Sequence, residues 1–243
     1  MGPISSIEMT KESIINRVRP FLTGKSPGEI IRIAHEEFGQ DLMMTTAFGY
    51  SGIILLSFVK DVYPDIPIYF IDTTYHFEET LKLRLKLMDD WGLNIQKVSS
   101  GRPETELIGL MGEQAYKSDP DTCCYYRKVE PLENILEKDT VWLSGTRRDQ
   151  SRTRAQSTAI DIDGRGHIKV NPLFNWTRDA CWAYIRKYDL PYNPLHDQSY
   201  PSIGCTHCTR PVDLGGDERS GRWIGLDKTE CGLHISAPGE KNN

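Results

Sequence analysis

Six cysteines are the residues of this 243-residue chain that offer the most chemistry. Cys123 and Cys124 are adjacent, and Cys205 and Cys208 form a C-x-x-C pair. Four thiolates from two such pairs can make a tetrahedral sulfur site, which suits either zinc or an iron–sulfur cluster. The pairs of zinc ribbons are normally both spaced, so the adjacent pair slightly favours an iron–sulfur cluster. A redox C-x-x-C and unrelated thiols are the alternatives without metal.

The other two cysteines have contrasting neighbours. Cys181 falls on an apolar helical stripe, so we expect it to be a small buried hydrophobe. Cys231 lies in a polar, glycine-rich tail whose positive charge would stabilise a thiolate, although Glu230 acts in the opposite direction. One interpretation of Cys231 is a nucleophile on a mobile tail, and the other is an inert exposed thiol. The same tail carries Arg219, Arg222, Lys228 and His234.

Two further segments have the composition of anion-binding sites. A run of arginines follows the predicted strand at residues 141–144, and guanidinium forks suit phosphate and sulfate oxygens. The Gly-Tyr-Ser-Gly loop at residues 49–52 stands between a predicted strand and helix, where backbone N–H groups can face an anion. This loop lacks the G-K-[ST] of a Walker A sequence, and a solvated surface is the alternative for the arginines. The arginines of the run are Arg147, Arg148, Arg152 and Arg154.

Hydrophobic periodicity predicts the elements that must position these residues. Short apolar runs predict strands, and amphipathic runs between them predict helices. This alternation predicts an α/β fold, a mainly parallel sheet with helices on both faces, with ligands bound at the carboxyl edge. The predicted strands are residues 42–48, 67–71, 94–99 and 141–144. The predicted helices are residues 11–22, 27–38, 53–62 and 77–91, the last broadly buried through Leu81, Leu85 and Met88.

Local signals mark the limits of the second helix. Ser26 is suited to the N-cap, Pro27 to the first turn, and Glu29 completes a capping box. Gly39 stands where a C-cap belongs. These residues therefore predict a helix that begins after Ser26 and ends before Gly39.

The second half of the chain has a different texture. Residues 159–163 and 167–170 flank a Gly-Arg-Gly turn and predict a hairpin at one sheet edge. Thr177 is the predicted cap of a helix that carries Cys181, and the chain after residue 191 is loop-rich. We therefore divide the chain into an N-terminal helical segment, a nucleotide-binding and cluster domain, and a mobile tail. Their bounds are 1–40, 41–208 and 209–243.

The composition excludes several classes of protein. Hydrophobic residues make up 38% and charged residues 26% of the chain, which is typical of a globular protein. The longest nearly unbroken apolar run, residues 53–59, is too short to span a membrane, and the N-terminus does not resemble a signal peptide. A net charge of −5 argues against a sequence-blind nucleic-acid binder. Unpaired cysteines without an export signal predict a cytoplasmic location.

Taken in order, these segments resemble the assimilatory adenylyl-sulfate and phosphoadenylyl-sulfate reductases. The resemblance covers nearly the whole chain after residue 40, and KTECGLH is its most specific part. The two cysteine pairs are similar to those of the branch that carries an iron–sulfur cluster. The matching segments are TTAFGYSG, PDIPIYFIDTTYHFEET, CCYYRKVEPL, GTRRDQSRTRAQ, LPYNPLHDQSYPSIGCTHCTRP, ERSGRW and KTECGLH.

The resemblance implies a role for each matching residue. A [4Fe–4S] cluster would bind to Cys123, Cys124, Cys205 and Cys208, and Cys231 would be the nucleophile. The implied fold is the adenine-nucleotide α-hydrolase-like one, in agreement with the periodicity. The implied substrate contacts are Phe48, Gly49, Ser51, Lys128, Arg154, Arg219, Arg222 and His234.

The implied reaction is the reduction of adenylyl sulfate to sulfite and AMP, in sulfate assimilation and cysteine biosynthesis. Cys231 would form an S-sulfocysteine, and a thioredoxin or glutaredoxin-like dithiol would release sulfite from it. Plant-type enzymes carry a thioredoxin-like domain after this segment, so we expect the reductant here to be a separate protein. A homo-oligomer is compatible with the sequence.

The sequence departs from related patterns at two positions. ATP pyrophosphatases carry S-G-G-x-D-S in the first loop, whereas residues 48–52 read Phe-Gly-Tyr-Ser-Gly, which fits an enzyme that does not cleave ATP. Many family members read D-T-G after the second strand, whereas this chain has Thr74 in place of the glycine. The backbone contacts of that loop are therefore expected to differ.

Two alternative functions remain open from the sequence. Phosphoadenylyl sulfate would require an additional cation for its 3′-phosphate, for which Arg152 or Lys97 is available. A zinc-stabilised nucleotide-binding or tRNA-thiolation protein would need zinc instead of iron at the four cysteines. Comparing the two substrates separates the first alternative, and metal analysis separates the second.

Overall fold

The computed structural model describes residues 10–136, 140–213 and 217–234. A six-stranded sheet in the order β3-β2-β1-β4-β6-β5 organises these residues. All neighbouring strands pair in parallel except β5 and β6, which form the predicted antiparallel hairpin at one edge. The predicted mainly parallel sheet is therefore confirmed. The strands are β1 Leu42–Thr45, β2 Ile68–Ile71, β3 Ile95–Val98, β4 Val141–Leu143, β5 Ile160–Ile162 and β6 Ile168–Val170.

Side chains alternate between the two faces of the sheet because successive residues of a strand point in opposite directions. Met44 and Leu143 join the large core on one face, whereas Met43 and Trp142 belong to a smaller apolar cluster on the other. Trp142 lies in register with Met43 of β1 and with Lys169 of β6. A row of side chains thus crosses the second face, where the functional site lies.

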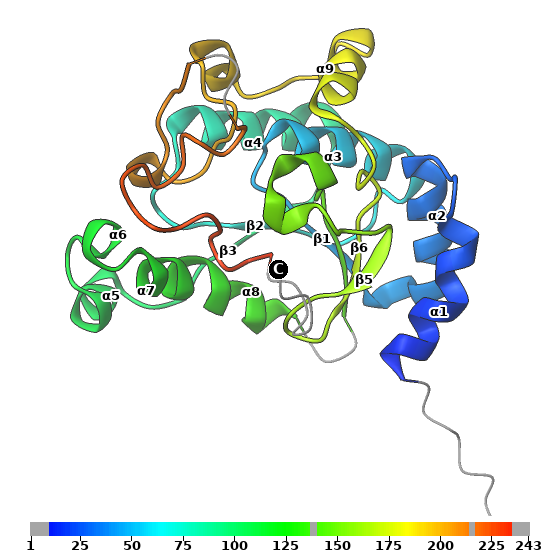
Figure 1. The fold of residues 1–243 in the computed structure, drawn as a ribbon, viewed down its shortest axis with the longest axis horizontal. Helices are drawn as coiled ribbons and strands as arrows, with labels where there is room; N and C mark the ends of the chain where they lie inside the picture. Colours follow the sequence, from blue (N-terminus) through cyan, green and yellow to red (C-terminus); the bar gives the residue numbers. More distant parts are fainter. Residues whose placement is uncertain (1–9, 137–139, 214–216, 235–243) are drawn as a thin grey trace, which may run out of the picture.

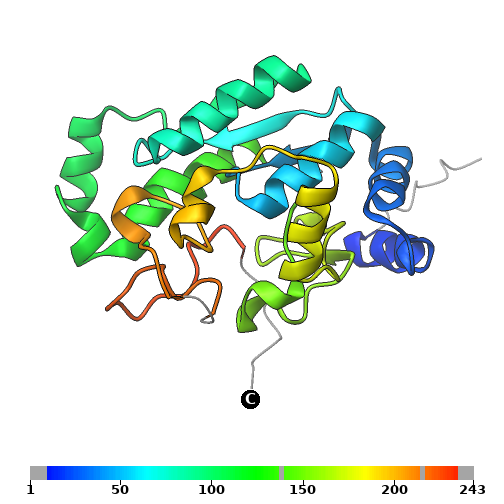
Figure 2. The same cartoon turned by 90° about the horizontal axis from the view of Figure 1, so that it is seen from above.

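Helices cover both faces, as predicted. The large core contains buried side chains from the N-terminal helices and from α3, α4 and α9, whereas the smaller cluster contains Leu132 of α8. Figure 1 shows α1 and α2 at one end of the molecule and α5–α7 at the other, and Figure 2 agrees. These longer helices are α1 Lys11–Leu22, α2 Pro27–Phe38, α3 Tyr50–Val62, α4 Glu78–Trp91, α5 Glu104–Met111, α8 Glu130–Ile135 and α9 Arg178–Lys187.

The predicted helix limits are confirmed where caps define them. The Ser26 hydroxyl accepts from the Glu29 N–H, and the Glu29 carboxylate accepts from the Ser26 N–H at 2.8 Å, which is the predicted capping box. Thr177 caps α9 by accepting from the Ala180 N–H. Gly39 ends α2 with a φ of 52°, a conformation that favours glycine.

The predicted buried face of α4 was wrong. Leu81 and Leu85 are 39% and 59% exposed, whereas Leu83 and Leu87 are buried in the large core together with Thr80. Positions 80, 83 and 87 form one helical face, so the helix has the usual one-sided pattern. Leucine occupies both faces of this segment, and only packing against the sheet determined which face is buried.

Residues 104–135 form a chain of helices that the periodicity did not predict. α7 (Pro120–Cys124) runs through the five-residue π-helix Tyr125–Val129 into α8. π-Turns inside helices often occur at functional sites. This one lies between the adjacent cysteines and α8 and carries Lys128. A short helix α6 (Ala115–Ser118) precedes α7.

The N-terminal helical segment shares the core of the sheet, because Ile15, Leu22 and Ile31 belong to the large cluster.

The carboxyl-terminal segment, red in Figure 1, runs back from the end that holds α5–α7 toward the middle of the sheet. Parts of the predicted tail, residues 214–216 and 235–243, lie outside the described residues. In the described ranges, no helix is long and apolar enough to cross a membrane.

Candidate active site

A cavity of about 210 Å³ lies at the carboxyl ends of β1, β2 and β4. Its lining includes Thr45, Ile71 and Ser144 from those strand ends. β1 lies between β2 and β4, where the strand order reverses direction, and open α/β sheets bind ligands at such a switch point. Cys231 and all of the predicted substrate contacts except Phe48 line this cavity. These contacts are Gly49, Ser51, Lys128, Arg154, Arg219, Arg222 and His234.

The loop between β1 and α3 forms one wall of the cavity. Gly49 is the N-cap of α3, so the first N–H groups of that helix face the cavity region. Gly52 approaches this loop closely, because a Cβ there would lie 2.8 Å from the Thr46 hydroxyl and would force that side chain to move. Phe48 has a φ of 57° and a fully buried side chain beside Phe70, outside the cavity lining. Any contact of Phe48 with a ligand would therefore involve its backbone.

Arg147 is a structural anchor below this loop. Its side chain is 0% exposed and donates to the Ser51 hydroxyl, to the Tyr50 hydroxyl at 2.7 Å and to Glu218 at 2.8 Å. Burial opposes its charge, but Glu218 together with Tyr50, Cys181 and Asp149 outweighs burial and raises the pKa of Arg147. Because Glu218 precedes Arg219, this ion pair attaches the ERSGRW segment to α3.

The four arginines of the predicted run do not share one site in the structure. Only Arg154 lines the cavity, from the short helical turn Arg152–Arg154. Arg148 donates to the Ser157 carbonyl at 2.6 Å and lies over the Phe174 ring. Neither Arg152 nor Lys97 belongs to the cavity lining, and Lys97 pairs with Asp72 at 3.1 Å.

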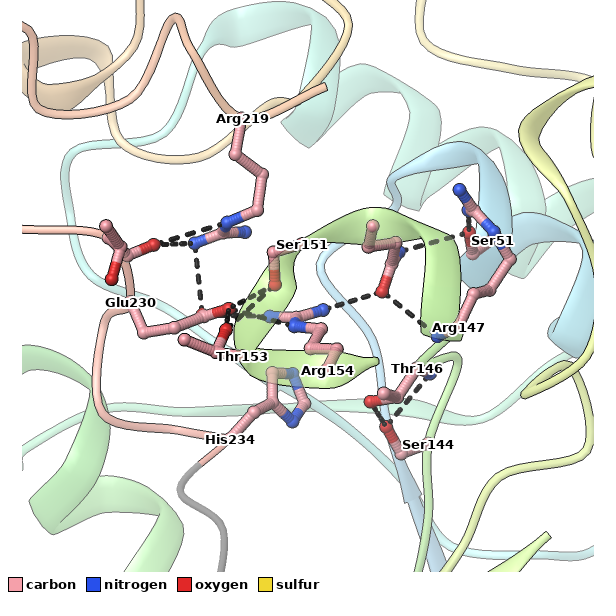
Figure 3. Close-up of polar contacts among 12 residues, drawn as sticks. Ser51, Ser144, Thr146, Arg147, Ser151, Thr153, Arg154, Arg219, Glu230 and His234 are labelled. Atoms are coloured by element: carbon pink, nitrogen blue, oxygen red, sulfur yellow. Dashed lines mark hydrogen bonds and ion pairs between the residues drawn. The ribbon is translucent and has the colours of Figure 1, made fainter. Parts of the chain in front are cut away.

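Glu230 lies between Arg154 and Arg219 (Figure 3). Arg154 donates through Nε at 2.9 Å and Nη2 at 3.0 Å, and Arg219 donates through Nη2 at 3.1 Å. The hydroxyls of Ser151 and Thr153 donate to the same carboxylate at 3.4 and 3.2 Å. Burial opposes ionisation of Glu230, but Arg154 and Arg219 outweigh it and lower the pKa of the carboxyl.

The two predicted cysteine pairs come together beside the cavity. Cys124, Cys205 and Cys208 pack with Trp223 in one buried cluster, against which Cys231 also packs. Cys123 is buried as well, and its pKa is raised to about 11, first by burial and then by the nearby Cys205. Burial raises the pKa of Cys124 to about 12.

The surroundings of these cysteines fit an iron–sulfur cluster. Two buried N–H donors next to them, Trp223 Nε1 and Arg127 Nε, have no acceptor among the described residues. Thiolate and sulfide sulfurs of a cluster would accept such hydrogen bonds. The donor set, four buried thiols with unsatisfied N–H groups, is thus compatible with a cluster. In the described ranges, no group of three or more His, Cys, Asp or Glu side chains is arranged to hold a metal ion.

Lys128 projects from the π-helix into the cavity lining. Lys128 is 8% exposed, and its ammonium group makes no hydrogen bond or ion pair within the described part of the chain. Burial opposes its charge, but Cys205, Cys231 and Cys124 outweigh this and raise the pKa of Lys128. Lys128 therefore carries a positive charge among the thiols.

Cys231 is half-buried and differs from the paired cysteines in its charge environment. Burial and Glu230 oppose ionisation, but Lys128, the Leu233 N–H and Arg222 together lower the pKa of the Cys231 thiol. Arg222 reaches this region across Gly204, where a Cβ would lie 2.3 Å from its guanidinium. The arrangement favours a thiolate at the cavity.

His234 also lines the cavity, three residues after Cys231 in the chain. Its ring stacks on Trp142 with centroids 5.1 Å apart, and Lys169 Nζ lies 3.3 Å from its Nδ1. Burial and the charge of Lys169 lower the pKa of His234 well below the usual value. Arg165 of the hairpin turn donates to the Gly232 carbonyl and, at 3.0 Å, to the Leu233 carbonyl.

The departure at Thr74 has a structural explanation. Thr74 has a φ of 63°, a conformation that glycine adopts without strain and a β-branched residue rarely adopts. Its N–H donates to Asp72 at 2.8 Å, and its hydroxyl accepts from Arg127 at 2.8 Å. The next residue back, Thr73, places its hydroxyl 3.3 Å from the Cys205 sulfur. Thr74 thus takes a left-handed backbone conformation that its contacts with Asp72 and Arg127 stabilise.

Sequence reasoning missed several residues around Cys231. Trp142, Lys169 and Arg165 belong to strands or a hairpin, and their alternation gave no functional signal. Glu230 was noted only as a charge that opposes the thiolate. Its contact with Arg154 depends on two segments 76 residues apart, which no local pattern shows.

Comparisons with known proteins agree with this geometry. The phosphoadenosine phosphosulfate reductase domain matches residues 41–211. The adenosine 5′-phosphosulfate reductase of Lysinibacillus sphaericus is 43% identical over 208 residues, covering 85% of this chain and 89% of that protein. The protein of the same name from Halalkalibacterium halodurans is 41% identical over 222 residues, covering 90% of this chain and 96% of that protein.

Solved structures show the same fold. The phosphoadenylyl-sulfate reductase of Candida auris, in a phosphate complex, has a TM-score of 0.70 and 32% identity, and covers 84% of this chain and 100% of that chain. The FMN adenylyltransferase of Candida glabrata has a TM-score of 0.55 and 15% identity, covering 87% of this chain and 73% of that chain, which shows the fold alone. On its sequence and its structure, the chain belongs to the phosphoadenosine phosphosulfate reductase domain family.

Proposed function

We propose that this protein reduces adenylyl sulfate to sulfite and AMP through a covalent sulfonate on Cys231. One observation carries the proposal: Cys231 lies at the cavity beside Lys128 and Arg222, with the pKa of its thiol lowered. The relatives named adenosine 5′-phosphosulfate reductase support this substrate. Arg152 and Lys97, the two cations considered for a 3′-phosphate, do not belong to the cavity lining. This also supports adenylyl sulfate as the substrate.

The first step transfers the sulfonate to the enzyme. The Cys231 thiolate attacks the sulfur of adenylyl sulfate, an S–S bond forms, and the bond from sulfur to the phosphate oxygen breaks. AMP leaves with that electron pair. Lys128 and Arg222 offset the negative charge of the sulfate while the anionic nucleophile approaches it.

The second step needs an external dithiol of the thioredoxin or glutaredoxin type. One thiolate attacks the Cys231 sulfur, sulfite leaves with the electron pair of the S–S bond, and a mixed disulfide forms. The second thiol of the reductant resolves this disulfide and regenerates the Cys231 thiol. Two electrons from the dithiol thereby reduce the sulfate sulfur to sulfite.

We further propose that Cys123, Cys124, Cys205 and Cys208 bind a [4Fe–4S] cluster. The cluster would supply a buried charged group next to Lys128, and no electron transfer through it is required because the dithiol supplies both electrons. Reduction of the cluster in step with sulfite formation, seen by electron paramagnetic resonance, would contradict this role.

Mass spectrometry after anaerobic incubation with ³⁵S-labelled adenylyl sulfate, without reductant, tests the main proposal. We expect an SO₃ adduct on the peptide that contains Cys231, no adduct in Cys231→Ser, and a normal adduct in Cys181→Ser. An adduct on another peptide, or no adduct in the iron-loaded protein, would contradict the assignment of Cys231 as the nucleophile. Phosphoadenylyl sulfate should be assayed in parallel, because the Candida auris relative is named a phosphoadenylyl-sulfate reductase. Sulfite release from it that is as fast as from adenylyl sulfate, or faster, would contradict adenylyl sulfate as the substrate.

A further inference from the structure

Glu230 is a buried carboxylate that the proposed chemistry leaves without a role. Its side chain is 13% exposed, and both oxygens are bound by Arg154 and Arg219 (Figure 3). Two guanidinium forks around one pair of oxygens are also the arrangement that proteins use to bind sulfate or phosphate. Glu230 thus occupies the cation pair that an anionic ligand of the cavity would need.

The carboxylate and an anionic ligand compete for the same charges. Arg154 and Arg219 both line the cavity, and within the described residues neither guanidinium group has another carboxylate partner. If Glu230 stayed in place, its charge would repel a sulfate or phosphate brought within contact distance. If it left, both guanidinium groups would face the ligand.

The segment after Cys231 is attached in a different way. Arg165 holds the Gly232 and Leu233 carbonyls, and the Leu233 side chain packs against the apolar cluster that contains Trp142. Arg165 lies outside the cavity lining and pairs with Glu133 at 3.2 Å, and Leu233 is held by apolar atoms, so an anion in the cavity does not compete for these contacts. Only the segment before Cys231 is bound through a charge that a ligand can replace.

We propose that Glu230 is an internal anion that holds Cys231 in its resting position, and that an anionic group of the substrate replaces Glu230 on Arg154 and Arg219. The inference rests on the proposed function, because it places the substrate's sulfate or phosphate at this arginine pair. Replacement moves the peptide next to the nucleophile, whereas the attachment through Arg165 keeps that peptide at the cavity. Binding of the substrate and repositioning of Cys231 are then one event.

Calorimetry of AMP binding to the iron-loaded protein tests the competition without any turnover. Glu230→Gln keeps the size of the side chain and removes its charge, so we expect AMP to bind at least about fivefold more tightly, within the usual range of coupling between sites. Glu78→Gln removes an exposed negative charge on α4 and should change the AMP affinity less than twofold. An AMP affinity that is unchanged or weaker in Glu230→Gln would overturn the inference.

Hydrogen–deuterium exchange gives a second readout that includes the unmodified protein. AMP should speed amide exchange at residues 229–231 in the wild type, whereas Glu230→Gln should exchange quickly there with or without AMP. Arg165→Ala should speed exchange at residues 232–234 and leave the AMP affinity within twofold. Slower exchange at residues 229–231 on adding AMP to the wild type would overturn the inference. A missing SO₃ adduct would instead contradict the proposed function and leave both AMP measurements interpretable.

Discussion

The adjacent cysteines Cys123 and Cys124 carry the same thiol group as Cys231 in a neighbouring part of the molecule, yet the pKa values of the two regions shift in opposite directions. Burial raises the pKa of Cys123 to about 11 and that of Cys124 to about 12. Burial also opposes ionisation of Cys231, but Lys128, the Leu233 N–H and Arg222 outweigh it and lower the pKa. The comparison teaches that position relative to fixed positive charge, rather than burial, separates the Cys231 thiol from those of Cys123 and Cys124.

Position in the fold produces this difference. The cysteine pairs lie on α7 and on the short turn Thr206–Cys208, where Trp223 covers them. Cys231 lies on the segment that runs over the carboxyl edge of the sheet, where Lys128 and Arg222 line the cavity. The paired thiols are therefore suited to bind a group, and the single thiol is suited to attack one.

The largest effect should come from exchanging cysteine for serine in the two regions. Cys231→Ser removes the nucleophile, so sulfite release should fall below detection while iron and sulfide content stay at about four per chain. Cys205→Ser removes a ligand, so the protein should lose its iron, which elemental analysis and visible absorption would show. Full iron content in Cys205→Ser, or residual turnover in Cys231→Ser, would break the proposed division between the regions.

The charge of Lys128 should account for much of the difference between the thiols. Lys128→Met keeps an apolar stem and removes the ammonium group, so sulfite release should fall about 10²–10³-fold, as for loss of one charge-stabilising donor in other enzymes. Alkylation of Cys231 near pH 7 should also slow. Lys97→Met, which removes a cation outside the cavity lining, serves as the control and should change either rate less than twofold. Equal effects of the two substitutions would contradict the role of Lys128.

The pH dependence of alkylation compares Cys231 with a thiol that is buried and uncharged. A lowered pKa means that the Cys231 thiolate is already present below the usual thiol pKa, so the midpoint of its iodoacetamide rate against pH should lie below that of a free cysteine measured in parallel. Cys181 is fully buried, and burial raises its pKa to about 12, so it should stay unmodified in the native protein. Peptide mass spectrometry measures both sites in one sample. A midpoint for Cys231 at or above that of the free cysteine would contradict the lowered pKa.

The smallest effect should follow from Cys181→Ala. This substitution removes one buried sulfur from α9 without touching the cavity, so the free energy of unfolding should fall by about 1 kcal/mol. Iron content and sulfite release should stay at wild-type values. A loss of activity without a loss of stability would show that this buried thiol has a function that its packing does not indicate.

Much of the architecture could be predicted because it depends on local patterns. The capping box at Ser26, the strand-like apolar runs and the Gly-Arg-Gly hairpin each reflect chemistry within a few residues. The buried face of α4 could not be predicted in the same way, since leucines at positions 81, 83, 85 and 87 fit two faces equally well. The helices at residues 104–135 lack the strong periodicity that marks the longer helices.

The residues of the site show the same difference between what local patterns predict and what they do not. Cys123, Cys124, Cys205, Cys208 and Cys231 are conspicuous in the sequence because their residue type and spacing limit what they can do. Arg147 and Arg154 look alike in the arginine run, but one is a buried anchor and the other lines the cavity. Residue type alone does not distinguish these two roles, because both use the same hydrogen-bond donors.

By itself the sequence determined the chemical groups available, their order along the chain and the alternation of strands with helices. Only the tertiary structure decided that Lys128 lies beside Cys231, that Glu230 lies between two arginines and that His234 stacks on Trp142. The reason is physical. Charge interactions and hydrogen bonds act over a few ångströms, and the residues that make them are separated by up to about a hundred positions in the chain.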